Sequence, residues 1–329
     1  MPPTSANELN RALVDRFARD FAALADPGAS LLVAVSGGPD SVALLLLAHA
    51  ALGDRCSAAT VDHDLRPESA DEAAWVADRC AERGIRHAIL TAPLPERAGR
   101  TANLSARARE MRYGLLDAHA DTIGADLIAT AHHADDQAET LIMRLNRGAG
   151  VAGLAGVRAR SGRIVRPLLG WRHAELVALC AAQGIEPVED PSNVSDRFDR
   201  ARLRKNLAAI DWLDTDRIAA SAAALGDADD AIGWMVERLA AQLCHRDTAG
   251  VVLTVPHDLP FELRRRLAER CVTSLDATTS LRGSALAAAV RTLESGRPAM
   301  LGAVLAQPVR VGETGTQWRF SMAPPRRSG

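Results

Sequence analysis

The residues with the clearest chemical character follow a short apolar stretch near the start of the chain. Residues 31–35 are β-formers, the string SGGPDS comes next, and an apolar helical stretch follows it. Glycines let backbone N–H groups approach an anion, and a helix that begins there offers its positive end. No lysine follows the glycines, so the pattern is not a P-loop of the GxxxxGK[ST] type. The turn predicted to hold phosphate comprises Ser36, Gly37, Gly38, Pro39, Asp40 and Ser41.

Asp40 is the unusual member of this turn. A carboxylate beside bound phosphate is repelled unless a Mg²⁺ lies between them. The turn therefore predicts a pyrophosphate site with a metal, and the alternative is a tight turn in which Asp40 is an ordinary helix N-cap. The complete string, placed directly after a strand, favours the functional interpretation.

A second polar group follows the next predicted strand, in the string VDHDLR at residues 61–66. Asp62, His63 and Arg66 would line a nucleotide there. In the alternative interpretation, Asp62 caps a turn and Arg66 pairs with a neighbouring carboxylate. The string alone does not separate the two.

The densest polar cluster is TAHHADDQAETLIMRLNRGAG at residues 130–150. If a helix begins near residue 134, Asp136 and Glu139 lie three apart on one face, and Asp135 lies four before Glu139. Two such carboxylates could hold Mg²⁺ or receive an ammonium group; alternatively, the aspartates only complement the helix dipole, worth about 0.3–1 kcal/mol each. His132 and His133 suggest a transition metal, but no further histidine lies at ligand spacing, which favours oxygen-ligated Mg²⁺.

Arginine is clustered in two stretches. Residues 144–172 contain seven arginines and no acidic residue, and residues 197–205 contain four arginines and a lysine. Such clusters are typical of contact with a phosphate backbone. The net charge of −2 gives no support of its own to a nucleic-acid partner, and a solvated face is the alternative. The candidates for contact with phosphate or RNA are Arg112 (beside Tyr113, the only tyrosine), Arg147, Arg202 and Arg204.

Strands and helices alternate in the first part of the chain, after an amphipathic helix over 7–25. We predict strands near 31–35, 57–61, 86–91 and 126–130, and helices near 40–52, 69–83, 102–120, 134–146 and 173–183. This alternation predicts an α/β fold with a doubly wound parallel sheet, in which ligands bind beyond the carboxyl ends of the strands.

The character of the chain changes near residue 210. We expect residues 1–210 to form one domain, which carries the phosphate-binding turn, and residues 211–329 a second, smaller and mostly helical domain. The second domain would carry helices over 214–245, 259–274 and 281–294, with a short strand at 250–254. The tail APPRRSG is expected to be disordered.

Composition narrows the class of protein. The 329 residues are 47% hydrophobic and 24% charged, as in an ordinary globular protein. The five cysteines are scattered and form no CxxC pair, which argues for a reducing compartment. No apolar signal-peptide region and no run long enough to span a bilayer are present. We therefore expect a cytoplasmic protein without a membrane partner.

These motifs together resemble a known family. The string SGGPDS resembles the PP-loop of ATP pyrophosphatases, enzymes that cleave ATP between its α and β phosphates. The further strings VDHDLR, ARAREMRY, HHADDQAET, RPLL and EDPSNVSDRFDRARLR occur in order over about residues 30–205. With them, the chain resembles the tRNA(Ile)-lysidine synthase family.

The resemblance implies a reaction and roles for the residues. Such enzymes use ATP and Mg²⁺ to adenylate the wobble cytidine of an isoleucine tRNA, and free L-lysine then displaces AMP to give lysidine. By resemblance, the PP-loop residues hold ATP, while Asp62, His63 and Arg66 line the nucleotide pocket. Arg112, together with Arg202 or Arg204, is expected to contact phosphates of ATP or tRNA. The expected catalytic residues are Asp40, Arg112, His133, Asp136 and Glu139, with Asp40 and Asp136 as Mg²⁺ ligands. Homodimer formation is left open.

Two alternatives carry different chemistry. A PP-loop tRNA thiolase would share the adenylation step but would need a persulfide carrier or cluster cysteines, normally paired. A nucleotide-binding regulator would bind ATP without turnover, although the carboxylate-rich helix speaks against it.

Overall fold

The structure is a computed structural model that describes residues 9–62, 68–91, 104–188, 199–208, 210, 212–279, 281, 283–311 and 315–323. Its contacts divide the chain into two compact units, residues 1–225 and 226–329. That division falls inside the long helix α9, Thr215–Leu243. The domain boundary after residue 210 stays a prediction, and the tail from residue 324 lies outside the described residues.

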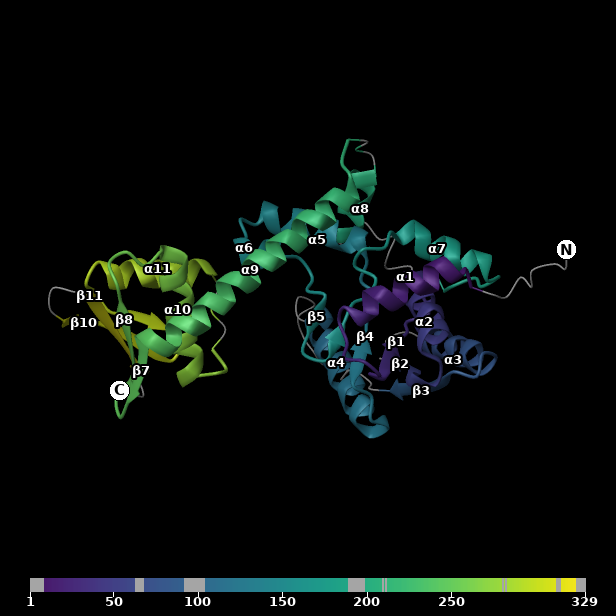
Figure 1. The fold of residues 1–329 in the computed structure, drawn as a ribbon, viewed down its shortest axis with the longest axis horizontal. Coiled ribbons are helices and arrows are strands. Elements are labelled where there is room, and N and C mark those ends of the chain that lie inside the picture. Colours follow the sequence, from purple (N-terminus) through teal and green to yellow (C-terminus); the bar gives the residue numbers. More distant parts are fainter. Residues whose placement is uncertain are drawn as a thin grey trace. The chain divides into compact units, whose positions relative to one another are not determined.

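The first unit contains a six-stranded sheet (Figure 1). Its strands are β1 (Leu31–Ala34), β2 (Cys56–Asp62), β3 (Arg86–Thr91), β4 (Leu127–Ala129), β5 (Arg160–Ser161) and β6 (Ile164–Val165). The spatial order is β3-β2-β1-β4-β6-β5, and every neighbouring pair is parallel except β5 with β6. The prediction of a doubly wound parallel sheet is confirmed.

Six of the eight helices described wholly within this unit lie close to where the sequence predicts them. The eight are α1 (Arg11–Ala22), α2 (Pro39–Leu52), α3 (Glu68–Ala81), α4 (Leu104–Ile123), α5 (Ala134–Asn146), α6 (Val151–Leu154), α7 (His173–Ala182) and α8 (Asp199–Ala208), with a 3₁₀ turn η1 at Gly53–Arg55. The short helix α6 and the helix α8 are additions to the predicted set.

Alternation along β1 places its side chains in two different cores. Leu31 and Val33 pack in a core with Phe17 of α1 and with residues of α2, α3 and α7. Leu32, on the opposite face, packs with Leu116 of α4. Successive strand residues point to opposite faces, so a strand buried on both sides reads as a continuous apolar run. The sheet is thus covered on both faces.

The sheet order fixes where a ligand can bind. The chain leaves β1 toward β2 on one side, whereas β4 lies on the other side of β1 and continues to β6. Strand order therefore reverses between β1 and β4, and crevices form outside the carboxyl ends of strands at such a point. The SGGPDS turn follows β1 and the HHADD string follows β4, so the fold brings these two motifs to one crevice.

The second unit contains α10 (Phe261–Leu275), α11 (Gly283–Glu294) and the C-terminal part of α9. These helices and the strand β8 (Gly250–Val255) lie where the sequence predicts them. The unit also contains β7 (Cys244–Asp247), β9 (Ala299–Leu301), β10 (Val304–Val311) and β11 (Gly315–Met322), which form with β8 an antiparallel sheet of order β7-β8-β11-β10-β9. This sheet was not expected from the sequence. Its inner face packs Leu253, Trp318 and Phe320 into the core of the unit.

Among the described residues, no helix is both long enough and apolar enough to cross a membrane.

Candidate active site

The SGGPDS turn is held in shape by its own hydroxyl and backbone groups. Gly37 has φ of +87°, a left-handed conformation that favours glycine. The Ser41 hydroxyl accepts a hydrogen bond from the Ser36 backbone N–H (3.1 Å) and donates one to the Gly38 carbonyl (2.9 Å). Val188 donates its backbone N–H to the Gly37 carbonyl at 3.0 Å. Gly38 precedes α2 as its N-cap residue, so the positive end of α2 opens at this turn.

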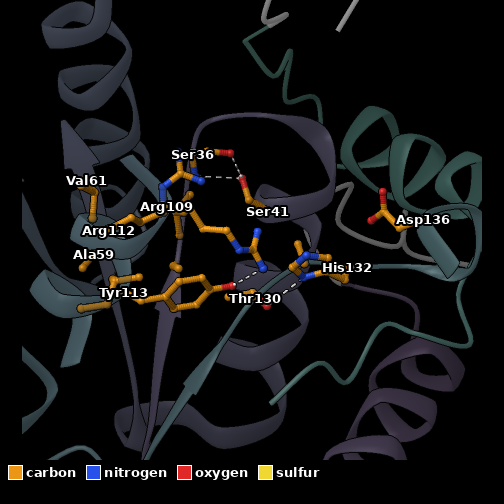
Figure 2. Close-up of a pocket in the computed structure, with 14 residues that line it drawn as sticks. Ser36, Ser41, Ala59, Val61, Arg109, Arg112, Tyr113, Thr130, His132 and Asp136 are labelled. Atoms are coloured by element: carbon orange, nitrogen blue, oxygen red, sulfur yellow. Dashed lines mark hydrogen bonds between the residues drawn. The ribbon is translucent and has the colours of Figure 1, made fainter. Parts of the chain in front are cut away.

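A cavity of about 230 Å³ lies beside the turn, between α4 and the ends of β1, β2 and β4. Figure 2 shows Ser36 and Ser41 lining it, with Arg109, Arg112 and Tyr113 reaching in from α4 and Thr130 and His132 from the end of β4. Arg109 donates to the Tyr113 hydroxyl at 3.2 Å, and its guanidinium carbon lies 5.0 Å from the centre of the Tyr113 ring. Two arginines facing a helix N-terminus create a site for an anion with an apolar floor.

A cluster of carboxylates and histidines adjoins the cavity at Asp136. Nδ1 of His173, the first residue of α7, donates to Asp40 Oδ1 at 2.7 Å. The Nε2 atom of His133 lies 3.5 Å from Asp40 Oδ2 and 3.6 Å from Asp136 Oδ2. The backbone N–H of His133 also donates to Asp136 at 3.2 Å. His133 is 3% exposed, so these charges interact in a poorly solvated place.

Mutual interaction stabilises the charged forms of His133 and Asp40 in this cluster. Burial alone would lower the pKa of His133, but its contacts with Asp135, Asp40 and Asp136 raise that pKa to about 10. Burial alone would raise the pKa of Asp40, yet His133 and His173 lower it to about 2. At neutral pH, therefore, His133 is an imidazolium paired with carboxylates and is not a free base.

The cluster fits a cation. Asp40 Oδ2 and Asp136 Oδ2 approach the same nitrogen of His133 from different elements, so two carboxylate oxygens converge on one positive centre. Oxygen ligands of this kind suit Mg²⁺. The assignment of Asp40 and Asp136 as Mg²⁺ ligands stays a prediction.

Asp135 faces a different set of groups from Asp136. It accepts the backbone N–H of His173 at 2.8 Å and binds the guanidinium of Arg172 at 3.1 and 3.4 Å. Burial opposes ionisation of Asp135, but His133, the His173 N–H and Arg172 outweigh it and hold its pKa well below the usual range. Asp135 therefore joins the start of α7 to the start of α5.

Glu139 is the most deeply buried carboxylate of the site. It is 2% exposed, and its Oε1 accepts a hydrogen bond from Nε of Arg204 in α8 at 2.6 Å. Its Oε2 is buried without a hydrogen-bond partner. Burial opposes the charge on Arg204, but Glu139 outweighs it and raises the pKa of Arg204. The pair fixes α8 against α5.

Comparison with known proteins identifies the family. A family model described as a PP-loop domain matches residues 6–210. A tRNA(Ile)-lysidine synthase of Novosphingobium aromaticivorans is 47% identical over 320 residues, covering 95% of this chain and 94% of that protein. The chain belongs to the tRNA(Ile)-lysidine synthase family. The resemblance inferred from the motifs is confirmed.

Two further comparisons agree with this family and its fold. A tRNA(Ile)-lysidine synthase of Zymomonas mobilis is 40% identical over 304 residues, covering 90% of this chain and 89% of that protein. A solved U34-tRNA thiolase from Methanococcus maripaludis, with its [4Fe-4S] cluster, superposes with a TM-score of 0.53 at 18% identity. The superposed region covers 65% of this chain and 78% of the thiolase chain. At this identity the similarity concerns the fold alone.

The remaining predicted residues of this lysidine synthase family member lie in several places. Asp62 ends β2 and accepts a hydrogen bond from the Ser69 hydroxyl at 2.7 Å. His63 and Arg66 lie outside the described residues, as does the EDPSN string. Arg202 is exposed on α8, and Arg147 is exposed at the C-terminal end of α5.

Most of the arginines in residues 144–172 form hydrogen bonds within the protein. Arg144 donates to the carbonyls of Gly153 and Gly156, and Arg163 binds two carboxylates of α4. Arg160, Arg166 and Arg172 also bond to backbone or carboxylate oxygens. The clustering that indicated a phosphate backbone therefore has an internal structural cause at these five positions, while contact through Arg147 stays a prediction.

Sequence reasoning missed His173 and did not assign a role to Arg109. His173 carries no local motif, and only the packing of α7 against α2 brings it to Asp40. Helical spacing could have identified Arg109 as a residue of the cavity, because it precedes Arg112 by three residues and Tyr113 by four and so lies on the same face of the helix.

We expect Arg204→Met to lower the free energy of unfolding of the first unit by about 2–3 kcal/mol, because the buried Glu139 carboxylate would lose its cation. Urea unfolding monitored by circular dichroism measures the change. Adding Glu139→Gln should recover most of the loss, and Arg147→Met, an exposed arginine, is the matched control. Equal free energies of unfolding for Arg204→Met and Arg147→Met would show that the Arg204–Glu139 pair does not stabilise the fold.

Proposed function

We propose that this protein ligates free L-lysine to C2 of the wobble cytidine in an isoleucine tRNA with a CAU anticodon, consuming ATP to AMP and pyrophosphate. The observation that best supports this proposal is that two sites adjoin one cavity. One is the anion site at the start of α2, and the other is the acidic cluster, which reaches the cavity wall at Asp136. Membership of the lysidine synthase family supports the same reaction.

ATP would lie in the cavity with its phosphates at the SGGPDS turn. Backbone N–H groups at the start of α2 and the Ser36 hydroxyl would bind the pyrophosphate portion. Arg112 and Arg109 would stabilise charge that develops on the α-phosphate, since cationic groups aimed at developing charge act strongly in a poorly solvated site. His63 and Arg66 stay predicted parts of the nucleotide pocket.

The substrate lysine would bind beside the acidic cluster that contains Asp40 and Asp136. Its ε-ammonium carries the charge that Asp136 and Asp40 attract, and a carboxylate beside it can orient the amine or accept its proton. His133, held as an imidazolium, would position these two carboxylates rather than act as the base. Mg²⁺, when bound by Asp40 and Asp136, would neutralise charge on the departing pyrophosphate.

The reaction would run in two steps. The C2 oxygen of the cytosine attacks the α-phosphorus of ATP, the bond to the β-phosphate oxygen breaks, and pyrophosphate leaves. The lysine Nζ then forms a bond to C2, the C2–O bond breaks, AMP leaves, and a carboxylate takes the proton lost by the amine. The base must leave the anticodon stack to reach the cavity, at a cost of a few kcal/mol.

The tRNA would also be held outside this cavity. Arg147 and Arg202 are exposed cations of the catalytic unit, and contact of Arg202 and Arg204 with phosphates stays a prediction. The second domain would bind the tRNA and present its anticodon loop. A homodimer also stays a prediction, which sedimentation velocity of the purified protein would check.

The thiolase alternative meets a chemical obstacle. Cys180 lies next to the turn, with its Sγ 3.4 Å from the Pro39 carbonyl. Burial, assisted by Asp40, raises the pKa of Cys180 to about 11, so the sulfur is a protonated thiol at neutral pH. A thiolate nucleophile or a cluster ligand would need the opposite environment.

The deciding experiment is incubation with total tRNA, ATP, Mg²⁺ and one radiolabelled amino acid at a time. We expect labelled lysine alone to become attached to tRNA, with one AMP and one pyrophosphate formed per lysine. In a parallel incubation with labelled sulfide in place of the amino acid, sulfur incorporation into tRNA would support the thiolase. ATP binding without pyrophosphate release would support the regulator. Formation of ADP would contradict the proposed chemistry.

A further inference from the structure

Asp40, His133 and His173 come from three separate elements and meet in one place. One carboxylate oxygen and one nitrogen from each imidazole all lie within 4.8 Å of one another. The two imidazole rings are 5.3 Å apart between centroids. Mg²⁺ was favoured from the sequence because no further histidine lies at ligand spacing from His132 and His133. The fold supplies that histidine from α7, as His173.

The donor atoms of this group differ from those that Mg²⁺ prefers. Mg²⁺ takes oxygen ligands in octahedral geometry, whereas imidazole nitrogen together with a carboxylate suits Zn²⁺, Co²⁺ or Ni²⁺. Three protein ligands are also the number found where such an ion keeps an open position. We propose that Asp40, His133 and His173 form a binding site for a dication of the zinc class.

The surroundings of His133 match those of a metal ligand. Its Nε2 faces Asp40, while its Nδ1 lies 3.4 Å from Asp135 Oδ2 and is buried without a hydrogen-bond partner. Metal-binding histidines usually place their second ring nitrogen beside a carboxylate, which fixes the ring and strengthens the ligand. A small movement of Asp135 would complete that hydrogen bond.

Asp135 also fixes the other histidine. It accepts the backbone N–H of His173 at 2.8 Å, and Arg172 holds the same carboxylate. One anchored carboxylate thus positions both imidazoles, so an arriving ion would displace the proton of His133 without having to rearrange the ligands. A site assembled in advance in this way loses little freedom on binding.

The site shares Asp40 with the proposed Mg²⁺ site. An ion of the zinc class bound there would remove Asp40 from the Mg²⁺–nucleotide complex and block the reaction. This consequence rests on the proposed function, whereas the binding itself does not.

The test is titration of the full-length protein with Co²⁺, without ATP or tRNA, followed by visible absorption. We expect absorption bands of Co²⁺ held by nitrogen and oxygen, and their loss when Zn²⁺ is added. His173→Gln keeps a polar side chain beside Asp40 but removes an imidazole, and it should weaken Co²⁺ affinity at least about 10-fold. His245→Gln, an exposed histidine of β7, is the matched control and should bind as the native protein does. Equal affinity in the two variants would overturn the proposal.

X-ray absorption of the Zn²⁺-loaded native protein gives a test that needs no variant. Two imidazoles in the zinc shell are expected. The pair Cys244 and Cys271, with sulfurs 3.6 Å apart, is the competing place for zinc, and a Zn–S distance of about 2.3 Å would reveal it and overturn the proposal. Neither measurement uses ATP or tRNA, so a failure of the proposed function would leave both results unchanged.

Discussion

Asp40→Asn is expected to lower the rate of lysidine formation about 10²–10³-fold, the size typical of losing one preorganised electrostatic contact. The amide fills the same space but carries no charge for Mg²⁺ or for the lysine ammonium. His133 would keep Asp135 and Asp136 as partners, so the fold should survive. The measurement is the single-turnover rate of labelled lysine incorporation into tRNA, with circular dichroism as the check on folding.

A matched control is available on the same unit. Asp54 is exposed in η1, and Asp54→Asn should leave the rate unchanged. A substitution of Asp136 would be harder to interpret, because Asp136 also accepts the backbone N–H of His133 at the start of α5 and its loss could disturb the helix. A native rate in Asp40→Asn would remove Asp40 from the reaction.

Trp171→Ala is expected to lower the free energy of unfolding of the first unit by about 3–5 kcal/mol, the usual cost of truncating a buried aromatic residue. Trp171 is fully buried. Its indole N–H donates to Asp20 at 2.8 Å, and the Arg16 guanidinium carbon lies 4.1 Å from the ring centre. Truncation would leave a cavity between α1 and the segment that leads into α7. Urea unfolding measures the loss.

The same substitution should also disturb the site. The Trp171 carbonyl accepts the backbone N–H of Ala134 at 2.8 Å, so Trp171 joins the start of α5 to the residues that precede His173. Trp212, which is 79% exposed, provides the control: Trp212→Ala should change stability by less than about 0.5 kcal/mol. A loss below about 1 kcal/mol in Trp171→Ala would contradict its role in the core.

The parallel sheet could be predicted because its signals are local. Each strand of the sheet core is a short apolar run, and each polar motif directly follows a strand. Parallel strands end at one edge, so both SGGPDS and HHADD were expected at that edge. The pairing of β1 with β4, which makes the two motifs neighbours, is known only from the structure. The family resemblance came from the same strings and is now supported along most of the chain.

The sheet of the second unit could not be predicted in this way. Its strands β10 and β11 carry polar residues and a proline among the apolar ones, which weakens the alternation that reveals a strand. The pairing of β8 with β11 joins segments that are far apart along the chain. Such pairing is stabilised by packing on Trp318 and Phe320 and not by local preference.

At the site, local sequence is enough to identify the residues that follow the strands: the glycine turn with Asp40, and His133, Asp136 and Glu139 after β4. The partners of these side chains depend on how distant helices pack. Packing of α7 on α2 placed His173 against Asp40, and packing of α8 beside α5 placed Arg204 against Glu139. The physical reason is that a backbone motif is specified by neighbours along the chain, whereas the pairing of distant charges is settled only when burial removes water from between them.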